Sequence, residues 1–142
     1  MAVYTHANAQ ANVARTNLSA GQLVTGHARY TLGPTLANGD VIRLFRVPAG
    51  ARIRNLLVFA QKLDAGGSPA VTLSIGDSTS ATRFFNASNV GQAGGVAELA
   101  VGAAPKGQEY LAEDTVIATV VAAPATQAAG TYFEVYLDYY LS

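Results

Sequence analysis

Two histidines, His6 and His27, are the only imidazoles in this 142-residue chain, which contains no cysteine. A metal site of the cupin type needs two or three imidazoles and a carboxylate around one ion. Both histidines precede the strand-like part of the sequence, and they do not form a His-x-His pair. We therefore expect neither to bind a catalytic metal, and we expect each to be exposed to solvent or to make local hydrogen bonds.

Carboxylates and hydroxyls are frequent, but their spacing forms no catalytic group. Asp40, Asp64 and Asp77 flank predicted turns, where Asp commonly caps its own backbone, and a calcium site made from two of them is the alternative. Glu113 and Asp114 are adjacent, which on a strand sends them to opposite faces and excludes an acid–base pair. No Gly-x-Ser-x-Gly motif is present. The sequence thus predicts no catalytic residues, no cofactor, no metal site and no enzyme activity.

The segments that would have to position such residues are short apolar runs separated by turns that contain Gly and Pro. Runs rich in β-branched and aromatic residues between such turns are typical of all-β proteins. Their spacing and unequal lengths favour a single-domain antiparallel β-sandwich, jelly-roll-like, over an up-and-down barrel. Strands are expected at residues 29–32, 41–47, 53–63, 71–75, 83–86, 96–101, 115–122 and 131–141.

The last predicted strand, 131–141, has the clearest alternation of apolar and polar residues. One set faces the core, and the opposite set presents Tyr132, Tyr136 and Tyr140 as an outward stripe. Tyrosine is favoured at protein interfaces because its ring is apolar and its hydroxyl is polar. The stripe therefore predicts a contact between subunits, or alternatively cross-strand packing under a loop.

Four arginines lie close together around the turn at residues 48–50. The 41–47 run is apolar on both faces, which happens when both faces are covered or when a bulge shifts the register. Simple alternation places the first two arginines on opposite faces and the last two on one face. The group is either a set of solvated strand ends or a contact for an acidic partner surface. These residues are Arg43, Arg46, Arg52 and Arg54.

The composition favours a protein whose surface is covered by other chains. Hydrophobic residues make up 50% of the chain and charged residues 13%, against roughly 25% charged in an average soluble domain. We therefore expect a homo-oligomer. The formal net charge of 0 disfavours nucleic acid as a partner. The absence of a long apolar stretch or a secretory signal argues against a membrane-bound or exported chain.

The neutral total conceals an uneven distribution of charge. Residues 1–83 contain eight of the nine Lys and Arg residues and three acidic residues, a net charge of +5, and residues 84–142 carry −5. Either the two halves form neighbouring strands whose charges pair within the domain, or separate basic and acidic faces steer assembly.

The first 26 residues differ in composition from the rest. They are rich in Ala, Asn, Thr and Gln and show no strong apolar period. We interpret residues 1–26 as an N-terminal arm that orders on a neighbouring subunit, with a frayed terminus as the alternative. Residues 27–142 are expected to form the β-sandwich domain.

Several turn-and-strand motifs occur in a recognisable order. They are LANGDVI at 36–42, VPAGARI at 47–53, GGSPAVTLSIGD at 66–77 and AGT at 129–131, which precedes a terminal strand rich in Tyr. This order resembles that of head decoration, or cement, proteins of tailed bacteriophages. The resemblance covers roughly residues 30–140, and its motifs are structural rather than catalytic.

The resemblance implies a virion structural protein on the capsid exterior. Members of this family are β-sandwiches that sit on or between capsid subunits, commonly as trimers, and stabilise the head. The resemblance therefore implies the major capsid protein and further copies of the chain as partners. Related folds occur in phage tails, so a tail or fibre module that binds a receptor or glycan is the alternative.

Overall fold

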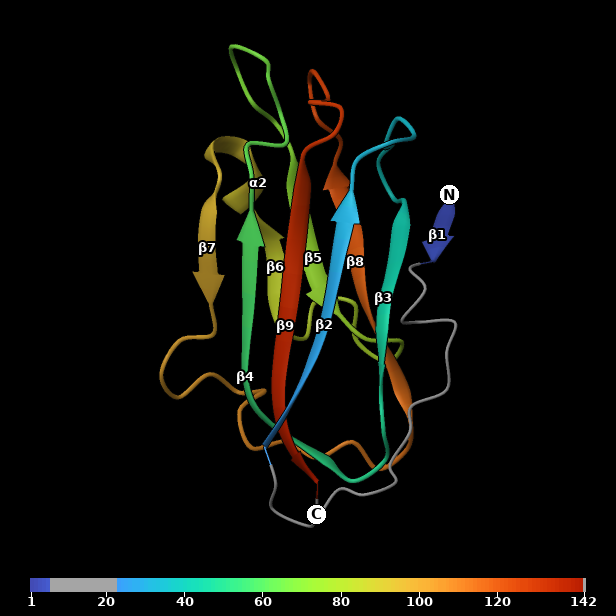
Figure 1. The fold of residues 1–142 in the computed structure, drawn as a ribbon, viewed down its shortest axis with the longest axis vertical. Coiled ribbons are helices and arrows are strands. Elements are labelled where there is room, and N and C mark those ends of the chain that lie inside the picture. Colours follow the sequence, from blue (N-terminus) through green and yellow to red (C-terminus); the bar gives the residue numbers. More distant parts are fainter. Residues whose placement is uncertain (6–22, 142) are drawn as a thin grey trace.

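Two β-sheets pack face to face in the computed structural model, which describes residues 1–5 and 23–141 (Figure 1). One sheet has the strand order β1-β3-β8-β5-β6 and the other β2-β9-β4-β7. The strands are β1 (Val3–Thr5), β2 (Leu23–Thr31), β3 (Val41–Val47), β4 (Ala51–Ala60), β5 (Thr72–Gly76), β6 (Phe85–Ser88), β7 (Gly95–Glu98), β8 (Asp114–Ala122) and β9 (Tyr132–Leu141).

Strands β2 to β9 have the order of a jelly roll, with four strands in each sheet and chain neighbours placed mostly in opposite sheets. All pairs among these eight strands are antiparallel. The prediction of a jelly-roll-like antiparallel β-sandwich is confirmed. β1 is an addition at the edge of the five-stranded sheet, where it runs parallel to β3.

The core lies between the two sheets and follows the alternation along the strands. In β9, Phe133, Val135 and Leu137 are fully buried, and they face buried side chains of β3 and β8 such as Ile42 and Val116. β9 lies between β2 and β4, so its inward side chains occupy the middle of the sandwich. Burial of this apolar surface is the main source of stability.

A β-bulge at Leu44 changes which way the arginines of β3 point. The register with β8 shifts between Arg43 and Phe45, so that Leu44 and Phe45 are both buried. Beyond the bulge the alternation is inverted, and Arg43 and Arg46 therefore lie on the same outward side. The prediction that they lie on opposite faces is wrong, because simple alternation ignores the extra residue.

β2 begins at Leu23, well before the strand predicted at 29–32. The prediction missed its first residues because they lack the apolar alternation that marks a strand. Gly26 is required in its middle, since a Cβ atom there would lie 2.7 Å from the ring of Phe45. Of the segment interpreted as an arm, residues 3–5 form β1, and residues 6–22, with His6, lie outside the described residues.

The turns sit at the two ends of the sandwich, and the segment between β6 and β7 is partly helical. The short helix α2 (Val90–Ala93) closes the side between β6 and β7. The 99–113 segment joins β7 to β8 at the end of the sandwich where the 48–50 turn also lies (Figure 1). No helix among the described residues is long and apolar enough to cross a membrane.

Candidate interaction surfaces

A buried carboxylate, Glu134 on β9, organises the outer face of the four-stranded sheet. Arg29 Nε donates to Glu134 Oε1 at 2.6 Å, and the Tyr136 hydroxyl donates to Oε2. The hydrogen bond from Tyr136, together with Arg29, holds the pKa of Glu134 below its usual range, although burial opposes this shift. The carboxylate is therefore ionised at neutral pH and fixes the side chains around it.

Aromatic contacts extend this arrangement, which we call the Glu134 cluster: His27, Arg29, Tyr132, Glu134 and Tyr136. The His27 ring stacks on Tyr136 with centroids 4.5 Å apart, and its Nε2 lies 3.7 Å from Glu134 Oε2. The Arg29 guanidinium lies 4.0 Å from the centre of the Tyr132 ring. His27 is thus half-exposed, in a local contact, as the sequence predicted.

The whole outer side of the four-stranded sheet, from β2 to β7, is called the tyrosine face below. The predicted outward orientation of Tyr132, Tyr136 and Tyr140 is confirmed, since all three are more exposed than the core residues between them. Leu23 and Val96 are also exposed here, by 44% and 59%. Outer sheet faces of monomers are normally polar, and on this face the two exposed apolar residues lie on the edge strands β2 and β7, with the tyrosines of β9 between them.

The four arginines around the 48–50 turn do not form one patch. Arg43 and Arg46 belong to β3 and point outward from the five-stranded sheet, whereas Arg52 and Arg54 belong to β4 and point outward from the opposite sheet. The prediction that Arg52 and Arg54 share a face is confirmed. These two lie on the tyrosine face, where Arg52 is the register partner of Tyr140.

Ion pairs connect the basic and acidic halves of the chain within the domain. Arg46 Nη1 lies 3.0 Å from Glu113 Oε1, and Arg52 Nη2 lies 3.7 Å from Glu109 Oε2. The intramolecular alternative for the charge split therefore accounts for these arginines, as it does for Arg29. Arg43 is exposed and has no ion pair or side-chain hydrogen bond with the residues that the structure describes.

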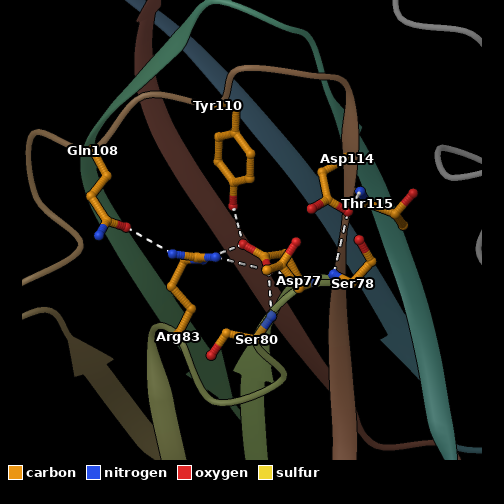
Figure 2. Close-up of polar contacts among 9 residues, drawn as sticks. Asp77, Ser78, Ser80, Arg83, Gln108, Tyr110, Asp114 and Thr115 are labelled. Atoms are coloured by element: carbon orange, nitrogen blue, oxygen red, sulfur yellow. Dashed lines mark hydrogen bonds and ion pairs between the residues drawn. The ribbon is translucent and has the colours of Figure 1, made fainter.

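Asp77 is fully buried at the end of β5, where it holds two loops together (Figure 2). The hydroxyl of Tyr110 donates to Asp77 Oδ2 at 2.9 Å, and the backbone N–H of Ser80 donates to Oδ1 at 2.9 Å. Arg83 approaches both oxygens with its guanidinium and also donates to Gln108 Oε1 at 2.9 Å. All lone-pair directions of the carboxylate are in use, so this is a structural clamp.

The electrostatics of this clamp follow from its burial and its partners. Burial alone would raise the pKa of Asp77, but the hydrogen bonds from Arg83, Ser80 and Tyr110 and the charge of Arg83 outweigh it, so the pKa is lowered. Burial and the neighbouring Asp77 carboxylate raise the pKa of Tyr110. Asp77 is therefore charged and Tyr110 neutral over the ordinary pH range.

Asp64 performs a similar task at the opposite end of the sandwich. Its two carboxylate oxygens accept backbone N–H groups of Gly66 at 3.0 Å and Ala70 at 2.8 Å within its own loop. They also accept those of Ala125 and Thr126 in the β8–β9 loop, at 2.8 and 3.0 Å. These bonds, led by that of Ala70, lower the pKa of Asp64. The predicted capping role is confirmed and extends to a second, distant loop.

No group of three or more His, Cys, Asp or Glu side chains within residues 1–5 and 23–141 is placed to hold a metal ion. A shallow hollow of about 390 Å³ lies beside the Asp77 clamp, lined by Glu113, Asp114 and the exposed Leu111 among others. Asp114 caps backbone N–H groups of Ser78 and Thr115 there. The lining therefore holds side chains that already have structural partners.

The buried carboxylates predict that the protein loses stability in acid. Asp40, Asp64, Asp77 and Glu134 all have folded-state pKa values below their usual range. Their stabilisation is complete above the unfolded-state pKa, about 4, and is lost as the pH falls through the lower folded-state values. Urea-denaturation midpoints should therefore fall steadily from pH 4 to pH 2. A midpoint that stays constant over this range would contradict the assignment.

Comparison with known structures shows where this sandwich occurs. The chain superposes on a chain of the capsid of Ralstonia phage GP4 with a TM-score of 0.85, 29% sequence identity and coverage of 99% of both chains. It has the fold of a phage capsid chain. A chain of the cyanophage Pam1 capsid asymmetric unit gives a TM-score of 0.75 and 27% identity, covering 94% of this chain and 95% of that one.

A more distant match shares the fold alone. A chain of the acid-stable capsid of Helicobacter pylori bacteriophage KHP30 gives a TM-score of 0.58 and 16% identity, over 87% of this chain and 90% of that one. No protein-family model matches the sequence, and no curated protein is significantly similar to it. The likeness to capsid chains is therefore visible chiefly in three dimensions.

Proposed function

We propose that the protein is a capsid decoration, or cement, protein of a tailed bacteriophage, which binds the outside of the head and bridges subunits of the major capsid protein. The observation that carries the proposal is the end-to-end match with a capsid chain of Ralstonia phage GP4. Coverage of 99% in both chains means that the match extends over the whole sandwich and not over a part of it.

The described sites support a structural rather than an enzymatic role. Asp64 and Asp77, the most deeply buried carboxylates, are saturated with hydrogen bonds from the protein itself. Glu134 is likewise engaged by Arg29 and Tyr136. Carboxylates in such surroundings hold loops and strands in place, and none is presented to a substrate.

Two surfaces are suited to assembly. We assign the tyrosine face to contacts between copies of the chain in a homotrimer, because it combines exposed apolar residues with aromatic rings fixed by the Glu134 cluster. Arg43, which is exposed on the opposite sheet and has no ion pair with the described residues, is assigned to an acidic surface of the capsid. A single exposed charge pair contributes only about 0–1 kcal/mol, so it would affect association rate and register more than affinity.

Binding to shells that lack the protein tests the proposal directly. Purified protein mixed with such heads should co-sediment with them, occupy repeated positions over the shell in cryo-electron micrographs and raise the temperature at which the heads rupture. Serum albumin provides the control for trapping in the pellet. Protein found only at the tail of native particles, in a few copies, would contradict the proposal and support the receptor- or glycan-binding module.

A further inference from the structure

The edge of the five-stranded sheet is completed by a strand from the very beginning of the chain. β1 has only three residues, and Val3, Tyr4 and Thr5 pair in parallel with β3. Just before it, Val41 N–H donates to the carbonyl of Ala2 at 2.9 Å. β1 lies at the outer edge of the sheet in Figure 1, with β3 as its neighbour.

The turn that receives the N-terminal strand is held by hydrogen bonds that do not involve β1. The backbone N–H of Asp40 donates to the Ala37 carbonyl at 3.1 Å, and its carbonyl accepts from Val120 N–H at 2.8 Å. Asp40 Oδ2 accepts the N–H of Ala37 at 2.9 Å, which holds the turn from within. The other oxygen, Oδ1, accepts the N–H of Ala2 at 3.0 Å. The turn thus presents a buried carboxylate oxygen and the edge of β3 to an incoming strand.

β1 itself, by contrast, makes few contacts with the rest of the domain. Tyr4 packs near Tyr30 with ring centroids 6.3 Å apart, while Met1 is 89% and Val3 45% exposed. A short edge strand with little buried apolar surface opens at much lower free energy than the whole domain. When it opens, Asp40 Oδ1 and the N–H of Val41 lose their partners, whereas the turn that carries them is unchanged.

We propose that β1 is exchanged between neighbouring copies, so that the Asp40 turn and β3 of one chain receive Ala2–Thr5 of the next. The proposal rests on the proposed function, because a shell that displays many copies holds their N-termini at high effective concentration. An exchanged strand makes the same bonds as its own, so exchange costs little free energy. The 17 residues between Thr5 and Leu23 can span at most roughly 60 Å.

Engineered cysteines can show whether β1 pairs with β3 of its own chain or of a neighbouring chain, because the natural chain has no cysteine. Val3 and Val41 are register partners, so V3C and V41C are placed on separate chains, mixed, bound to heads and oxidised. Exchange should give a disulfide-linked species of twice the chain mass on a non-reducing gel, about tenfold stronger than from either variant alone. V3C mixed with V101C provides the collision control, since Val101 is 99% exposed and follows β7, a strand of the other sheet.

A chain that carries both V3C and V41C verifies the geometry. In dilute solution it should form an internal disulfide, and on heads it should link chains instead. An internal disulfide alone on heads, or no disulfide in either setting, would overturn the proposal. The mixture is also oxidised in concentrated solution without heads, where a linked species would support exchange even if the wild-type protein failed to bind heads and the proposed function fell.

Discussion

Replacement of Asp77 with alanine is expected to lower the free energy of unfolding by about 3–5 kcal/mol, the usual effect of removing one partner from a buried ion pair. The substitution removes a shared acceptor from the partly exposed guanidinium of Arg83 and from the buried hydroxyl of Tyr110. It also removes the cap from the N–H groups of Thr79 and Ser80. Urea denaturation at pH 7, followed by circular dichroism, measures the change.

Two further variants separate the clamp from general effects of charge. Tyr110→Phe keeps the ring and removes only the hydroxyl, so it should cost about 1 kcal/mol. Glu113→Gln removes a carboxylate of the half-exposed pair with Arg46 and should cost less than about 1 kcal/mol. If Asp77→Ala were no more destabilising than Glu113→Gln, the buried clamp would not be a major source of stability.

The fold could be predicted from the sequence because it depends on local features. Glycine- and proline-containing turns and the alternation in residues 131–141 were enough to indicate an antiparallel sandwich, and β3, β8 and β9 were located to within a residue. β2 was predicted only in part, because its outward residues are polar and Gly26 interrupts its pattern. Gly26 is explained only by the ring of Phe45, which packs against it from another strand.

The candidate interaction surfaces and the buried carboxylate contacts were predicted less completely, because their interactions connect residues far apart in the chain. The tyrosine stripe follows from alternation and was found, but the pairing of Glu134 with Arg29 depends on β2 lying beside β9. Asp77 and Arg83 are only six residues apart, around a turn. That spacing of opposite charges was a local signal for the clamp, whereas Tyr110 could not have been linked to it from the sequence.

The second large effect is expected on the tyrosine face, where the double variant Leu23→Asp, Tyr140→Asp should abolish formation of the proposed trimer. The two residues are register partners on β2 and β9, and both are exposed, Tyr140 by 37%. Because the two Asp residues would face each other across neighbouring strands, the variant should lower folding stability by about 1 kcal/mol. In a trimer, however, they would bring several carboxylates together, and like charges in a contact cost several kcal/mol. The dissociation constant of the proposed trimer should therefore rise at least about 100-fold.

Sedimentation velocity over a range of concentrations measures this change, and Val101→Asp is the matched control. Val101 is 99% exposed on the 99–113 segment, outside the strands of the tyrosine face, so it receives one of the two added charges without standing in the proposed contact. A trimer that persists in the double variant, or a wild-type chain that remains monomeric both in solution and on heads, would contradict the assignment. A loss of association confined to the double variant would support the tyrosine face as the contact between copies, because Leu23 and Tyr140 are cross-strand neighbours on that face whereas Val101 lies outside its strands.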